Sequence, residues 1–190
     1  MPSRSLKTLQ LGVAGCGRIA QLVHLPELRR MPVSRVTALA EPEAKHREAA
    51  KALFPQAREF RDYRELLASA AVDALIVCLP SSLHAEAALA ALKAGVPVYV
   101  EKPLAVDEAS ARAVLQAWRS SGVLGMVGFN YRFHPLYLRA KAALEEGALG
   151  EVVAVRAVFS SAARRLAIRR ILQLAQVVFQ IVQKTSVLLA

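Results

Sequence analysis

Cysteine is scarce in this sequence, and long uncharged apolar runs are missing. The 190 residues include two cysteines, Cys16 and Cys78, which provide neither metal-ligand spacing nor a disulfide framework. No stretch of about 20 apolar residues is free of charged residues or Gln, and the N-terminus lacks an apolar run of signal-peptide length. We therefore expect two buried, reduced thiols, no metal, no membrane span and a cytoplasmic protein.

Acidic residues are absent from the end of the sequence, which makes the net charge of +10 uneven. All 15 acids lie at or before Glu151, and six of the 25 cations follow it, so the first 151 residues carry 19 cations against 15 acids. A surface that binds phosphate backbones should gather Lys and Arg on the folded body, so we expect no nucleic-acid partner. The alternative is a basic tail that binds nucleic acid or an anionic membrane, and such binding would collapse with salt.

Short apolar runs alternate with helical patterns along most of the chain. The predicted strands cover residues 9–14, 35–40, 57–60, 74–79, 97–100 and 124–129. The predicted helices between them cover residues 18–30, 43–53, 63–68, 83–93 and 107–120. This alternation is typical of βαβ units and a parallel sheet, and six strands match the two halves of a doubly wound α/β fold over residues 1–128.

The pattern changes after this sheet. Residues 129–160 are predicted to hold a linker helix over 136–146, ended by Gly147, and a strand over 152–159 that has no partner yet. They therefore form only the start of a second α+β domain. Residues 161–190 are an atypical basic and apolar tail, in which a helix over 164–183 would be apolar nearly all round and would need burial or a partner.

The turn after the first predicted strand fits the pattern G-x-G-x-x-A, in the segment Gly15-Cys16-Gly17-Arg18-Ile19-Ala20. Gly15 permits the tight turn, Gly17 lets the backbone approach a pyrophosphate, and the small Ala20 allows close packing of helix and strand. Backbone N–H groups at the start of the helix, at the positive end of its dipole, favour a diphosphate. The motif thus indicates a Rossmann dinucleotide site.

Glu41 ends the second predicted strand, about 20 residues beyond the glycine-rich turn. A carboxylate at this place accepts hydrogen bonds from both ribose hydroxyls of NAD and repels the additional phosphate of NADP. Lys45 and Arg47 are close enough in sequence to weaken that discrimination. We expect NAD as the cofactor, with NADP left open; the alternative for Glu41 is a solvated loop acid before Pro42.

Three further segments each follow the carboxyl end of a predicted strand, where ligands bind in open α/β sheets. They are residues 79–84 (LPSSLH), 101–105 (EKPLA) and 128–135 (GFNYRFHP). A lysine held at this edge, here Lys102, can hydrogen-bond a substrate hydroxyl or move its proton. The alternative is a surface lysine paired with Glu101.

Together these motifs resemble the Gfo/Idh/MocA oxidoreductase family over residues 9–159. The resemblance implies a Rossmann domain followed by a domain with a large, mostly antiparallel sheet. It also implies a dehydrogenase that acts on sugars, polyols, cyclitols or related alcohols, and it leaves a homo-oligomer open.

The resemblance also implies roles for individual residues. In the glycine-rich turn, the pyrophosphate would be contacted by Gly15, Gly17, Arg18, Ile19 and Ala20. Glu41 would face the adenosine ribose. The nicotinamide side of the cofactor would lie along Leu79, Pro80, Ser81 and His84.

At the reacting end, Glu101 would touch the nicotinamide ribose and Lys102 would contact the reacting hydroxyl. Asn130 and Arg132 would shape the nicotinamide end of the pocket. The alternative for His84 is a local hydrogen bond to backbone at a helix N-terminus. His24 is expected to pack at a helix end and is given no role.

The sequence departs from the family after about residue 160. The family's second domain carries a D-x-G-x-H-x-x-D type segment that supplies the proton-transfer partner, and this sequence has none. A frameshift, a degraded gene or a truncation would produce the acid-free tail. We therefore expect cofactor binding with little or no turnover; the alternative is a non-catalytic NAD(H)-binding module that regulates a partner.

Overall fold

The computed structural model describes residues 7–69, 71–156 and 158. The chain divides into two compact units, residues 1–138 and 139–190. The first unit contains one six-stranded sheet with the strand order β3-β2-β1-β4-β5-β6, in which every pair of neighbours is parallel. The strands are β1 (Leu9–Ala14), β2 (Ser34–Ala40), β3 (Arg58–Phe60), β4 (Ala74–Val77), β5 (Val98–Val100) and β6 (Gly125–Val127). This order is that of a doubly wound Rossmann sheet, and it confirms the predicted fold class.

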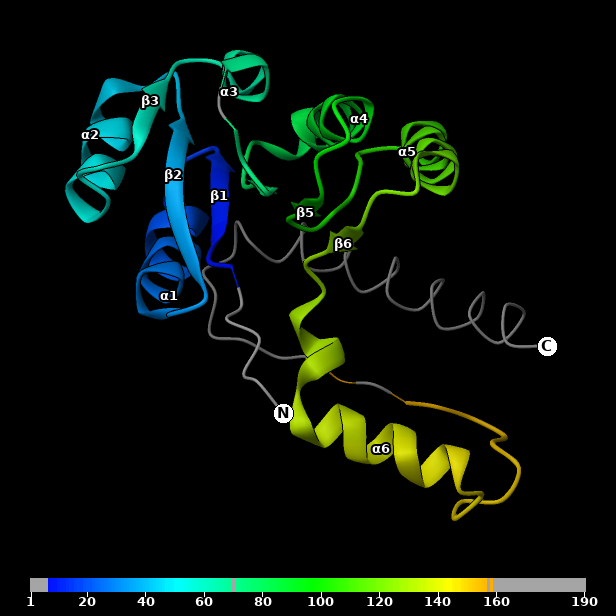
Figure 1. Cartoon of the computed structure of the whole chain (residues 1–190). Helices are drawn as coiled ribbons and strands as arrows, with labels where there is room; N and C mark the ends of the chain where they lie inside the picture. The colour runs from blue at the N-terminus through cyan, green and yellow to red at the C-terminus, as the bar shows by residue number, and fades with distance from the viewer. Residues whose placement is uncertain (1–6, 70, 157, 159–190) are drawn as a thin grey trace, which may run out of the picture. The chain divides into compact units, whose positions relative to one another are not determined.

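Helices cover both faces of this sheet, as a parallel sheet requires. Figure 1 shows α1 and α2 beside β1 and β2, and α4 and α5 toward β5 and β6. The α-helices are α1 (Leu25–Arg30), α2 (Ala44–Leu53), α3 (Tyr63–Ser69), α4 (His84–Lys93), α5 (Glu108–Ser121) and α6 (Pro135–Glu145). Short helical turns are η1 (Ala20–His24), η2 (Ser81–Leu83) and η3 (Asn130–Phe133). Within the described ranges, no helix combines the length and apolar character needed to cross a membrane.

Two buried clusters form the core, one on each face of the sheet. The alternation of side chains along a strand sends Leu75 and Val77 of β4 toward α3, α4 and α5. Ile76, between them, packs with Val13 and Leu25 in the cluster on the α1 and α2 side. The sheet is thus apolar on both faces, which explains why β4 reads as a continuous apolar run.

The structure differs from the sequence prediction at three places. The first predicted helix contains a π-helical turn, η1, before α1 begins. Strand β4 ends at Val77, and Cys78 and Leu79 already belong to the following turn. The strand predicted over residues 152–159 is wrong for its described part, since residues 152–156 and 158 are exposed and outside any strand. A strand without a neighbour has no ladder to stabilise it. The helix predicted over 164–183 lies outside the described residues.

Gly15 brings the first strand against the fourth. Its φ is +88°, and a Cβ built there would lie 2.6 Å from the carbonyl carbon and oxygen of Cys78 and 2.7 Å from the Leu79 nitrogen. Only glycine fits both the left-handed backbone and this close approach. Gly95 and Gly122 also have positive φ values, +70° and +66°, and end α4 and α5 as predicted.

Both cysteines are buried free thiols in the cluster on the α1 side, as predicted. Burial raises the pKa of the Cys16 thiol to about 12, and the nearby Glu41 carboxylate adds to the rise. Burial also raises the pKa of the Cys78 thiol to about 12, with smaller contributions from Glu101 and Cys16. These thiols therefore stay neutral in the folded protein near neutral pH.

Gly15→Ala is expected to lower the free energy of unfolding by at least about 3 kcal/mol, because the new Cβ would have a strained backbone conformation and would overlap the backbone of Cys78 and Leu79. Gly95→Ala is the matched control. It has a similar positive φ but open space around the Cβ position, so its expected cost is about 1 kcal/mol. Urea unfolding of both variants measures the difference, and equal costs would show that the contact with Cys78 is unimportant.

The raised thiol pKa values also predict a pH dependence of stability. A thiol that ionises near 9.0 when exposed and near about 12 when buried loses its proton first in the unfolded chain. Stability is therefore expected to fall as the pH rises from about 9 to about 12. Cys78→Ala should flatten this slope relative to the unsubstituted chain in urea unfolding; an unchanged slope would contradict the assignment.

Candidate functional site

The predicted site segments all leave the sheet at its carboxyl edge. In a doubly wound sheet the chain leaves adjacent central strands in opposite directions, and the resulting crevice lies outside the ends of β1 and β4. The glycine-rich turn follows β1, Glu41 follows β2, and residues 79–84 follow β4. Glu101 and Lys102 follow β5. The strand order therefore collects segments that are far apart in sequence at one edge.

The glycine-rich turn has an open side and a closed side. Among the described residues, a Cβ at Gly17 would meet nothing within 4 Å, whereas Gly15 is closed by the backbone of Cys78 and Leu79, which follow β4. Helical backbone begins at Arg18, and Arg18 and Ile19 are exposed. Ala20 is fully buried in the core cluster. The first amides of this helical segment have no carbonyl partner within the helix, so the open side presents donors and no side-chain obstruction.

The Glu41 carboxylate lies next to this turn and is held by backbone. Its Oε2 accepts a hydrogen bond from the Cys16 nitrogen at 2.7 Å, and its Oε1 accepts one from the Glu43 nitrogen at 3.0 Å. Only 7% of the residue is exposed. Glu41 is therefore not the solvated loop acid of the alternative interpretation. Each carboxylate oxygen still has a lone pair for a further donor.

The Arg47 side chain donates to the backbone at the end of β2. Its Nη1 donates to the Glu41 carbonyl oxygen at 2.7 Å and to the Pro42 carbonyl oxygen at 3.2 Å. Its Nε lies 3.6 Å from Oε2 of Glu59, and the side chain is 15% exposed. The Arg47 guanidinium thus satisfies the carbonyl oxygens that follow β2. Lys45, by contrast, is exposed.

His84 links the segment after β4 to the segment after β5. Its Nδ1 lies 2.6 Å from the Pro103 carbonyl oxygen and its Nε2 lies 2.8 Å from the Leu79 carbonyl oxygen. The residue is 2% exposed, so the local backbone bond considered from the sequence is present together with a second, long-range one. Pro80 is exposed and Ser81 is partly exposed, which leaves these two residues facing outward from the same segment.

Glu101 and Lys102 occupy different environments. Oε1 of Glu101 lies 2.8 Å from Nε2 of His24, and its Oε2 accepts a hydrogen bond from the Lys102 nitrogen at 3.1 Å. Lys102 is exposed, and the Lys102–Pro103 peptide is cis. Among the described residues, the Lys102 ammonium has no ion pair, so the alternative pairing of Lys102 with Glu101 is wrong. Sequence analysis missed His24, which comes from a segment 77 residues away.

Asn130 and Arg132 follow β6 in η3 and are both exposed. No described contact joins either side chain to Lys102. The approach of β6 to β5 is instead fixed at Gly128, where a Cβ would overlap the Tyr99 hydroxyl. Burial raises the pKa of Tyr99, and the Glu101 carboxylate raises it further. The Tyr99 hydroxyl and Oε1 of Glu101 lie 2.3 and 3.4 Å from the position that a Cβ would take at Gly128.

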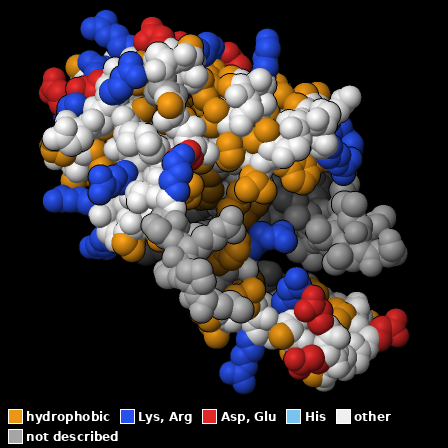
Figure 2. Space-filling model, in the orientation of Figure 1, with side chains coloured by type: hydrophobic (Ala, Val, Ile, Leu, Met, Phe, Trp, Pro, Cys, Tyr) orange, Lys and Arg blue, Asp and Glu red, His pale blue; other side chains and the backbone are white. Residues whose placement is uncertain are grey.

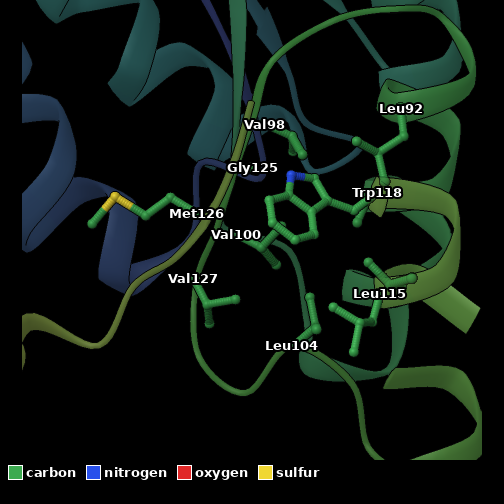
Figure 3. A pocket seen from close by; sticks show the side chains of 11 residues that line it. Leu92, Val98, Val100, Leu104, Leu115, Trp118, Gly125, Met126 and Val127 are labelled. Carbon is green, nitrogen blue, oxygen red and sulfur yellow. The ribbon is translucent and has the colours of Figure 1, made fainter. Parts of the chain in front are cut away.

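An apolar cavity of about 210 Å³ lies elsewhere, between α5 and the sheet. Figure 3 shows Leu115 and Trp118 of α5 facing Val98 and Val100 of β5. None of the predicted site residues lines it. In the described part of the chain, no group of three or more His, Cys, Asp or Glu side chains is arranged to hold a metal. On the face seen in Figure 2, Lys and Arg side chains are spread among acidic ones.

Comparisons with known proteins agree with this arrangement. Residues 9–129 match the family described as "Oxidoreductase family, NAD-binding Rossmann fold". An inositol 2-dehydrogenase of Paracoccus denitrificans (strain Pd 1222) is 39% identical over 146 residues, which are 73% of this chain and 42% of that protein. A dTDP-3,4-didehydro-2,6-dideoxy-alpha-D-glucose 3-reductase of Actinomadura kijaniata is 35% identical over 154 residues, 80% of this chain and 46% of that protein.

Solved structures give the same result. A scyllo-inositol dehydrogenase of Lactobacillus casei, with bound NAD(H) and scyllo-inositol, has a TM-score of 0.71 at 26% identity over 76% of this chain and 43% of that one. KijD10, a 3-ketoreductase of Actinomadura kijaniata in complex with NADP, has a TM-score of 0.67 at 35% identity, over 76% of this chain and 46% of that one. The chain spans less than half the length of these relatives. It belongs to the Gfo/Idh/MocA oxidoreductase family, and the matched residues are that family's NAD-binding Rossmann fold.

Proposed function

We propose that this chain is the cofactor-binding part of an NAD-dependent dehydrogenase that acts on a hydroxyl of a sugar, polyol or cyclitol. The observation that carries the proposal is the Glu41 carboxylate, hydrogen-bonded to Cys16 of the glycine-rich turn at 2.7 Å beside the open face of Gly17. This arrangement puts a ribose-hydroxyl acceptor and diphosphate donors side by side. The substrate class is supported by the relatives named as inositol dehydrogenases.

In this proposal the diphosphate is held by the turn at Gly15 and Gly17 together with the N–H groups of Arg18 and Ile19, and Ala20 lets the helix pack closely enough to aim them. Glu41 accepts hydrogen bonds from the adenosine ribose. Glu101 does the same for the nicotinamide ribose.

Leu79, Pro80 and Ser81 border the nicotinamide, on a segment that the His84 ring ties to Pro103. Asn130 and Arg132 close the nicotinamide end after β6. The nicotinamide, when bound, supplies the acceptor or donor of the hydride.

Lys102 is proposed to act on the substrate oxygen. Oxidation of the alcohol breaks a C–H bond, whose electron pair leaves with the hydride, and an O–H bond, whose proton must go to a nearby group. The Lys102 ammonium is exposed and unpaired within the described residues, so it is available to donate a hydrogen bond to that oxygen and to help carry the proton. In the reduction, the same ammonium polarises the carbonyl and supports protonation of its oxygen.

The carboxylate of Glu41 also favours NAD over NADP in this proposal. A phosphate on the adenosine ribose would lie beside a buried anion, and like charges in contact repel strongly. The Nη1 and Nε groups of Arg47 already face carbonyl oxygens and Glu59, so they are not free to bind that phosphate. Lys45 is the exposed cation that remains near the end of β2.

The first test is a titration of the purified chain with NADH, followed by the fluorescence of the reduced nicotinamide. Saturable binding of one NADH per chain is expected, and no binding would overturn the proposed function.

NAD reduction with a panel of cyclitols and sugars then tests the substrate class. Any rate that the chain supports should be lost in Lys102→Ala, while NADH affinity stays within about threefold and Lys93→Ala, on an exposed site of α4, changes neither.

Glu41→Ala is expected to lower the ratio of NAD affinity to NADP affinity about tenfold, because both the ribose acceptor and the repelling charge are removed. Glu41→Gln keeps an acceptor for Cys16 without the charge and should raise NADP affinity with less damage to the turn. The measurement is the Kd for each cofactor by calorimetry.

Glu43→Ala is the control for the Glu41 variants, since that carboxylate is exposed and pairs with His46 on the surface. It should leave the NAD-to-NADP ratio unchanged. A ratio that is the same in Glu41→Ala and in the unsubstituted chain would remove Glu41 from the cofactor site.

A further inference from the structure

The His24–Glu101 pair joins two parts of the cofactor edge that are far apart in sequence. The two side chains are 15% and 13% exposed, and the His24 Nε2 lies 2.8 Å from Oε1 of Glu101. The other carboxylate oxygen accepts from the Lys102 nitrogen at 3.1 Å. Because each oxygen of the Glu101 carboxylate has its own partner, the plane of the carboxylate is held in one orientation.

The backbone around His24 is shaped to make this contact. His24 is the last residue of η1, a π-helical turn that directly follows the glycine-rich turn. A π turn contains more residues than an α turn, so it changes the direction in which later side chains leave the helix. The regular helix of α1 resumes at Leu25, which is fully buried in the core. The irregular turn therefore ends where His24 reaches Glu101.

A second contact holds the imidazole itself. The rings of His24 and Tyr99 meet edge to face, with centroids 5.6 Å apart and planes at 67°. The hydroxyl end of Tyr99 packs against Gly128, where no Cβ would fit. Tyr99 of β5 thus contacts the ring of His24, and Glu101, directly after β5, lies at hydrogen-bond distance from its Nε2.

We infer that His24 is a positioning residue for the nicotinamide end of the site: it holds the Glu101 carboxylate, and through it the Lys102 backbone, in the orientation used for the nicotinamide ribose. This inference rests on the proposed function, in which Glu101 contacts that ribose. It differs from the contacts of His84, whose two ring nitrogens face backbone carbonyl oxygens and no carboxylate among the described residues.

The inference makes a prediction about which part of the cofactor is affected. If His24 acts through Glu101, its loss should weaken ligands that contain the nicotinamide ribose and spare those that lack it. ADP carries the adenosine and the diphosphate but neither the nicotinamide nor its ribose. General damage to the turn after β1 would instead weaken ADP and NADH together.

The test compares NADH and ADP binding to His24→Phe, which keeps an aromatic ring against Tyr99 but removes the hydrogen bond. NADH should bind about tenfold more weakly, while ADP affinity should be unchanged. His24→Gln restores a donor toward Glu101 and should recover most of the NADH affinity. His46→Phe is the matched control, because His46 pairs with an exposed carboxylate on α2, and it should change neither affinity.

A double-mutant cycle keeps the test decisive even if one variant is less stable. On a Glu101→Gln background, His24→Phe should have little further effect on NADH binding, since the residue it positions has already been altered. Equal losses for NADH and ADP, unchanged NADH affinity, or additive losses in the cycle would each overturn the inference while leaving the proposed function intact. An unsubstituted chain that binds neither ligand would overturn both.

Discussion

The backbone of Gly15 lies directly against the carbonyl group of Cys78, and the arrangement of the site depends on this contact. No side chain separates Gly15 from the segment that follows β4, so the turn after β1 lies directly against that segment. From there its amides meet Glu41, arriving from β2. The helix that follows is then close enough for His24 to reach β5. A wider separation of β1 and β4 would take these partners out of hydrogen-bond range together.

Much of the fold follows from local features of the sequence. Each of the six strands of the sheet was predicted within two residues at either end, because apolar runs and helical patterns alternate. Gly95 and Gly122 were predicted to end helices because glycine adopts a positive φ without a steric penalty, which is a property of the residue itself. The strand over 152–159 failed because a strand is stabilised by its neighbours, and periodicity cannot show whether a neighbour exists. The π turn at η1 was also missed, because a helical pattern of apolar residues does not distinguish an α turn from a π turn.

The site residues divide in the same way. The glycine-rich turn and Glu41 are recognisable because a fixed spacing links strand, turn, helix and acid. The sequence could not show that Arg47 is hydrogen-bonded to carbonyl oxygens. It also could not show that Glu101 pairs with His24, while Lys102 has no ion pair in the described part of the chain. These pairings depend on which side chains meet across the sheet, and that is set by strand order and register. His84 shows both kinds of information, since one of its ring nitrogens has a local partner and the other a partner in a distant segment.

The contact between Tyr99 and Gly128 has a consequence for the substitutions that this chain can accept. A residue larger than glycine at 128 would displace the Tyr99 ring, and the ring in turn supports the imidazole of His24. A smaller residue at 99 would remove both the obstacle and the support. Substitutions at positions 24, 99 and 128 are therefore coupled in this chain, although the three residues belong to a helical turn, a strand and the segment after the neighbouring strand.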